Sequence, residues 1–198
     1  MRRCVRSGMR GVAAAGVLLL AALPSCSKGR QPPTPDSPEW KIRDALHAAP
    51  EAVTRGARVM GWPVGFDPVP PQLRAGSTAW TCLPDEPATP GIDPVCMDSV
   101  FTASAAALAA RRPPAIASVG VAYRLQGGTY ASATQPFRTE PTAGQPWVTT
   151  GPHLEIVLPD LRALAGISTD WKKGTPYVLW AKTPYARLIV PVGFADER

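Results

Sequence analysis

Apolar residues recur at helical spacing in two parts of the chain. The sequence SPE at residues 37–39 supplies a capping hydroxyl, a proline for the first turn and an acid for the positive end of a helix. Apolar residues at helical spacing follow over residues 42–53, although Pro50 should divide this helix into two pieces. A second helix is predicted over residues 97–108, with Asp98 as its capping residue.

Alternating or continuous apolar runs predict strands in the second half of the chain. Residues 117–125 give the clearest alternation, and residues 154–158 form an apolar run that only Glu155 interrupts. Residues 177–181 and 187–192 flank a turn-forming stretch and predict a hairpin. With shorter candidates nearer the N-terminus, these elements predict an α+β fold in a single domain: an antiparallel sheet of about five strands with two main helices on one side.

The stretch 126–152, which connects two of the predicted strands, is rich in Gly, Thr and Pro. A long connection without secondary structure of its own is usually functional or disordered. It carries Trp147, and an aromatic ring in a loop can bury itself in a partner's pocket or stack on a ligand. We take this stretch as the candidate binding element, with Trp147, His153 at the following strand and Tyr185 in the predicted hairpin turn as candidate binding residues.

The first 25 residues have the pattern of an export signal. Four arginines and no acid precede the apolar run 12–23, which is too short to span a bilayer. Removing residues 1–25 lowers the formal net charge from +6 to +2, because it takes away those four arginines. The remaining chain has no basic run of the kind that binds nucleic acid, so the sequence predicts no nucleic-acid partner.

The sequence LPSC at residues 23–26 resembles the lipobox of bacterial lipoproteins. This resemblance implies cleavage before Cys26 and attachment of lipid to that cysteine. Ser27 follows, rather than the aspartate that often retains such proteins in the inner membrane, and this favours the outer membrane. The alternative is cleavage after Ser27 at a small-x-small site, which would discard Cys26.

These features predict the organisation of the whole chain. Residues 1–25 are a lipoprotein signal peptide, residues 26–39 are a flexible Pro-rich tether, and residues 40–198 are a globular α+β domain. Extended like polyproline, the tether would reach roughly 40 Å from the bilayer. The expected location is the periplasmic face of a membrane of the cell envelope, reached through the lipid anchor.

Cys82 and Cys96 remain beyond the predicted lipidation site. In an oxidising compartment a lone pair of cysteines is expected to form a disulfide rather than a metal site. Closing a loop of about 15 residues stabilises a fold by roughly 3 kcal/mol in the chain-entropy model.

Neither a metal ion nor a cofactor is predicted. Asp85, Glu86, Asp93 and Asp98 surround the cysteine loop, but their spacing matches no EF-hand, and Asp98 already has a role as a helix cap. His153 is the one histidine in a position to line a cleft. No pair or triple of histidines therefore suggests zinc.

The chain also lacks the common motifs of nucleophilic catalysis. Residues 40–198 contain no G-x-S-x-G or S-x-x-K sequence, and the predicted disulfide leaves no free thiol in the domain. A periplasmic hydrolase that uses His153 with nearby acids, such as Asp98, Glu155 or Asp160, remains the alternative to a binding module.

Four short sequences resemble a family of uncharacterised secreted bacterial proteins: WTC at 80–82, PVCMD at 94–98, WVTTGPH at 147–153 and TPYA at 183–186. The likeness covers residues 57–192 and implies a fold-level grouping without a mechanism. The sequence therefore predicts a membrane-anchored envelope lipoprotein that binds an envelope protein or a small ligand. A purely structural part of an envelope assembly would have no pocket. Nothing in the sequence indicates the oligomeric state.

Overall fold

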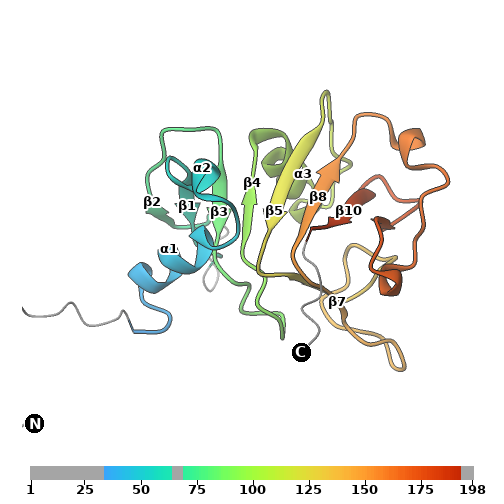
Figure 1. Ribbon diagram of the computed structural model, residues 1–198, viewed down its shortest axis with the longest axis horizontal. Helices are drawn as coiled ribbons and strands as arrows, with labels where there is room; N and C mark the ends of the chain where they lie inside the picture. Colours follow the sequence, from blue (N-terminus) through green and yellow to red (C-terminus); the bar gives the residue numbers. More distant parts are fainter. Residues whose placement is uncertain (1–33, 64–68, 193–198) are drawn as a thin grey trace, which may run out of the picture. The chain divides into compact units, whose positions relative to one another are not determined.

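The computed structural model describes residues 34–63 and 69–192 of the chain (Figure 1). The predicted signal segment, Cys26 and most of the tether lie outside the described residues. The helices are α1 (Pro38–Leu46), α2 (Glu51–Thr54) and α3 (Ser99–Ala109), with two 3-10 helices, η1 (Leu161–Leu164) and η2 (Trp171–Lys173). The strands are β1 (Arg58–Met60), β2 (Gln72–Arg74), β3 (Thr81–Leu83), β4 (Val95–Met97), β5 (Gly120–Arg124), β6 (Gly128–Tyr130), β7 (Val148–Thr150), β8 (His153–Val157), β9 (Tyr177–Leu179) and β10 (Arg187–Pro191).

Local capping signals place the helices where the sequence predicts them. The hydroxyl of Ser37 accepts the Trp40 N–H at 3.2 Å, and α2 begins directly after Pro50. One oxygen of the Asp98 carboxylate accepts the Phe101 N–H at 2.7 Å, which satisfies a donor at the start of α3. The predicted helix starts are thus confirmed.

The large sheet has the strand order β2-β1-β3-β4-β5-β8-β10-β9. The mixed α/β class is confirmed, but the expected sheet of about five antiparallel strands is wrong. The described sheet has eight strands, and β1 pairs in parallel with β3. The missed strands β2 and β4 are three residues long. Neither lies in a longer apolar run, and three residues alone cannot show the alternation from which a strand is recognised.

The two longer helices lie on opposite faces of this sheet, so the expectation that both cover one side is also wrong. Alternate residues of β4 show this, because side chains of a strand point to opposite faces in turn. Cys96 packs in the cluster that contains Ala45 of α1, whereas its neighbours Val95 and Met97 pack with Phe101 of α3. In Figure 1, α1 lies in front of the sheet and α3 behind it.

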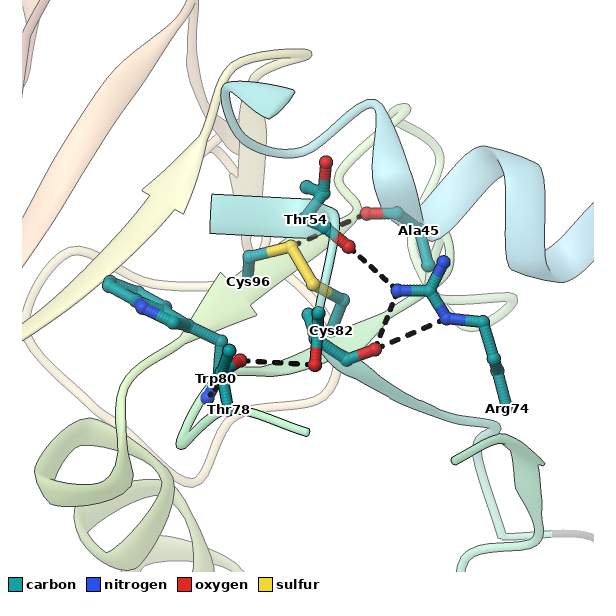
Figure 2. Close-up of a disulfide and its surroundings, with 9 residues drawn as sticks. Ala45, Thr54, Arg74, Thr78, Trp80, Cys82 and Cys96 are labelled. Carbon is teal, nitrogen blue, oxygen red and sulfur yellow. Dashed lines mark hydrogen bonds between the residues drawn. A yellow bond between two sulfur atoms is a disulfide. The ribbon is translucent and has the colours of Figure 1, made fainter. Parts of the chain in front are cut away.

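The predicted disulfide is present between Cys82 of β3 and Cys96 of β4, which are direct partners in the antiparallel register. Figure 2 shows its surroundings: the sulfur of Cys96 lies 3.6 Å from the carbonyl oxygen of Ala45 in α1. Arg74 of β2 donates to the carbonyl of Thr54 at 2.7 Å. The disulfide and the arginine therefore join this end of the sheet to the helices that cover it.

The connection 126–152 has secondary structure of its own, contrary to expectation. Its ends form the separate two-stranded sheet of β6 and β7, in which Thr129 lies opposite Thr149. A Cβ at Gly128 would lie only 2.7 Å from the Cε1 atom of His153, so β6 can approach β8 this closely only with glycine there.

Within residues 34–63 and 69–192, no helix has the length and apolar character to cross a bilayer.

Candidate binding site: a cavity on the α3 face of the sheet

A cavity of about 350 Å³ lies between α3, the sheet face that packs on α3, and residues 129–147, here called the covering segment. Sheet and helix contribute a mostly apolar wall that includes Leu83, Val95, Met97, Phe101, Ala105 and Leu108. The volume falls in the range of small-molecule sites, which are typically concave and largely apolar with a few placed polar groups.

Three tryptophans border the cavity, and two of them are held by hydrogen bonds. The indole N–H of Trp62 donates to the carbonyl of Pro84 at 2.9 Å, and that of Trp180 donates to the carbonyl of Ser132 at 2.8 Å. Trp180 adopts a φ of 55°, which is uncommon for a bulky residue. Its backbone N–H also donates to the carbonyl of Ala133 at 2.8 Å, so two hydrogen bonds hold this part of the wall against the covering segment.

A buried charge cluster adjoins the cavity. It comes from three adjacent strands, because Arg124 of β5, Glu155 of β8 and Arg187 of β10 all point to the α3 face. One oxygen of Glu155 accepts from Nε of Arg124, and the other accepts from Nη1 of Arg187 at 2.9 Å. Both arginines border the cavity, whereas Glu155 lies behind them with no exposed surface.

Glu155 is ionised despite its burial. Burial by itself raises the pKa of a carboxylate, but the charges of Arg124 and Arg187 outweigh that effect and hold the pKa of Glu155 well below its usual value. One negative charge is therefore shared by two guanidinium groups.

Tyr130 and His153 complete the buried polar group. The Tyr130 hydroxyl lies 2.9 Å from an oxygen of Glu155 and 3.0 Å from Nε2 of His153, and Nδ1 of His153 lies 2.7 Å from the Gly151 carbonyl. Burial lowers the pKa of His153, and burial together with the charge of Glu155 raises the pKa of Tyr130. A neutral imidazole therefore donates from Nδ1, and the single tyrosine proton is shared between two acceptors.

The candidate binding residues lie in different places. Trp147 borders the cavity. His153 is fully buried beneath the covering segment and does not border it. Tyr185 is also buried away from the cavity wall: its ring packs edge-on against Phe137, and its carbonyl lies 3.5 Å from Nε of Arg187.

Sequence reasoning missed the two arginines and Tyr130. One signal for them was available, because Glu155 interrupts an apolar run, and a charged residue in a buried strand requires a partner of opposite charge. Arg124 and Arg187 lie on two of the predicted strands, and in the structure both side chains point to the α3 face of the sheet. Which strands become neighbours of β8, however, is not encoded in any local pattern.

The acids around the cysteine loop have structural partners. The carboxylate of Asp85 accepts the Asp93 N–H at 2.8 Å, and that of Asp93 accepts the Glu86 N–H at 3.2 Å. Asp98 caps α3, and Asp160 forms an exposed ion pair with Arg162. Among the described residues, no group of three His, Cys, Asp or Glu side chains is placed to hold a metal ion.

No family model matches the chain, and the comparisons with curated proteins and with solved structures gave no significant match. The resemblance of its short sequences to secreted bacterial proteins therefore stays a prediction.

Proposed function

We propose that this protein is a lipid-anchored module of the cell envelope that binds a small, largely apolar molecule in the cavity between α3 and the covering segment. The observation that carries the proposal is the cavity itself, with its preorganised aromatic and aliphatic wall. The covering segment is part of the connection in which the sequence analysis places the binding element. A purely structural envelope protein would not need such a cavity.

The anchoring half of the proposal rests on the sequence. The basic and apolar leader and the LPSC sequence at residues 23–26 support lipid attachment at Cys26, and Ser27 favours the outer membrane. The Pro-rich tether would let the domain reach ligands at some distance from the bilayer.

Binding is favoured over hydrolysis by the position of His153. A general base must reach the proton that it abstracts, but His153 has no exposed surface and both its ring nitrogens lie at hydrogen-bond distance from internal groups. The Tyr130 hydroxyl lies at hydrogen-bond distance from both His153 and Glu155, so these buried groups are engaged with one another. The exposed pair of Asp160 and Arg162 is not part of this cluster.

The test uses 1-anilinonaphthalene, a neutral dye whose fluorescence increases in apolar surroundings. The protein is the full chain carrying Cys26→Ser, so that no lipid or detergent competes for the dye. Ala109 borders the cavity and is exposed, and its neighbour Ala110 is exposed but does not border it. We expect Ala109→Trp to reduce dye binding and Ala110→Trp to leave it unchanged.

Dye bound elsewhere on the chain is common to both variants and cancels in their comparison. Equal binding by the two variants, or no binding by the parent chain, would contradict the proposed function.

A further inference from the structure

Residues 134–146, here called the outer loop of the covering segment, form part of the cavity wall but have few ties to the rest of the fold. Four of them border the cavity: Gln135, Pro136, Arg138 and Thr139. Among the described residues, every hydrogen bond of the outer loop stays within residues 132–146. All its residues except Pro136 and Pro141 are exposed. A loop with exposed backbone and few buried contacts opens at a low cost in free energy.

The two ends of the outer loop are held in place. At one end, the indole and backbone N–H groups of Trp180 donate to the carbonyls of Ser132 and Ala133. At the other end, Val148 of β7 pairs with Tyr130 of β6. Opening of the covering segment is therefore restricted to the outer loop between these two points.

Phe137 joins the outer loop to two other parts of the molecule. Its ring centre lies 5.1 Å from that of Tyr185 in the turn between β9 and β10, with the ring planes at 76°. The Cζ atom of Arg111, just beyond α3, lies 5.1 Å from the centre of the same ring. Phe137 is 40% exposed, whereas Tyr185 belongs to the buried cluster that contains Trp180. An exposed ring of the loop thus contacts a buried ring and a guanidinium group.

The backbone of Arg111 is unusual for an arginine. Its N–H donates to the carbonyl of Leu108 at 2.9 Å. The next N–H, that of Arg112, donates to the carbonyl of Ala107 at 2.9 Å. These two bonds are the Schellman motif, which places a left-handed residue after the helix and usually uses glycine. Arg111 adopts this conformation with a φ of 52°. A side chain kept at a position that favours glycine indicates a role that glycine cannot supply.

We propose that the outer loop is a lid over the cavity and that Phe137, held by Tyr185 and Arg111, is its latch. In the closed state the latch connects the loop to the end of α3 and to the β9–β10 turn. Release of the ring lets the loop move away from α3 and gives access to the cavity. This inference concerns access to the cavity and does not depend on which molecule the cavity binds.

The test measures this access without any ligand, by the rate at which iodoacetamide alkylates an introduced cysteine. The protein is the full chain carrying Cys4→Ser and Cys26→Ser, in which the disulfide protects the remaining cysteines. Ala105→Cys places a thiol at a half-buried position of α3 that borders the cavity. Ala103→Cys is the reference, because Ala103 is exposed on the same helix and does not border the cavity. We expect the thiol at position 105 to react about tenfold more slowly than the reference or less, since local opening limits its exposure.

Variants of the latch should accelerate the reaction at position 105 and leave the reference rate unchanged. We expect Arg111→Gly to accelerate it about threefold, since an exposed cation–π contact is weak, and Phe137→Ala to do so about tenfold, since it removes both ring contacts. The two changes together should be no faster than Phe137→Ala alone, because Arg111 acts through this ring. Arg112→Gly is the matched control and should have no effect, since Arg112 is exposed and has no ring contact among the described residues.

Equal rates at positions 105 and 103 in the parent chain would overturn the lid. Equal acceleration by Arg111→Gly and Arg112→Gly, or none by either Arg111→Gly or Phe137→Ala, would overturn the latch. If Ala105→Cys fails to fold, stopped-flow exchange of 1-anilinonaphthalene replaces the alkylation: Phe137→Ala should accelerate both association and dissociation, and unchanged rates overturn the proposal. Alkylation that depends on the latch in a chain that binds no dye would contradict the proposed function and leave the lid standing.

Discussion

The carboxylate of Glu155 on β8 lies 2.9 Å from Nη1 of Arg187 on β10, and the two side chains are 0% and 5% exposed. Arg124 on β5 donates to the other carboxylate oxygen. Three neighbouring strands thus share one buried charge cluster on the α3 face. Loss of Glu155 would remove the counter-charge that both guanidinium groups share, so the contribution of the cluster to stability can be measured at this residue.

Replacing Glu155 with Gln keeps the shape of the side chain and leaves two guanidinium groups without their shared counter-charge. We expect the free energy of unfolding to fall by about 3–5 kcal/mol, the usual cost of breaking a buried ion pair, measured by urea denaturation. As a control, Asp160→Asn removes the acid of the exposed pair with Arg162 and should change the stability little. Equal losses in the two variants would contradict the role of the buried cluster.

The stabilisation by Glu155 should depend on pH with a definite sign. The folded-state pKa is lowered by Arg124 and Arg187, so below about pH 4.3 the unfolded chain takes up this proton first. The contribution is full above that pH and decreases as the pH falls toward the folded-state pKa. We expect the stability difference between the parent chain and Glu155→Gln to be constant between about pH 7 and 8 and to shrink below about pH 4.

Urea titrations of both proteins at a series of pH values test this expectation. Because other acids titrate in both chains, only the difference between the two proteins is informative. A difference that grows as the pH falls would show that the pKa of Glu155 is raised and not lowered.

The disulfide between Cys82 and Cys96 closes a loop with a sequence separation of 14. In the chain-entropy model, removing it with the double change Cys82→Ala and Cys96→Ala should lower the free energy of unfolding by about 3 kcal/mol. Reduction with dithiothreitol should destabilise the parent chain and leave the double variant unaffected. Two reactive thiols in the denatured, unreduced domain would contradict the pairing.

Lipid attachment is expected at Cys26. Cells that express the parent chain should incorporate radiolabelled palmitate into the protein, and Cys26→Ser should abolish the label and release the domain from the membrane fraction. Cys82→Ala with Cys96→Ala is the matched control, since it removes two cysteines and keeps the anchor. Label retained after Cys26→Ser would overturn the assignment.

Local sequence chemistry was sufficient where an element depends only on its immediate neighbours. The capping groups Ser37 and Asp98 marked the helix starts, and the two hairpin strands around residues 182–186 were recognised from their apolar runs. The disulfide followed from the number of cysteines and the expected compartment. The strands β2 and β4 were missed, because each has three residues and lies in no longer apolar run that would distinguish it from a loop.

The basic and apolar segment at residues 1–25 and the LPSC sequence at residues 23–26 predict the anchor, and Glu155 within an apolar strand indicates a buried charge. The cavity was decided only by the tertiary structure. Arg124, Glu155 and Arg187 are far apart in the chain and meet because β5, β8 and β10 become neighbours. Strand order depends on long-range packing, and no local pattern of residues specifies it.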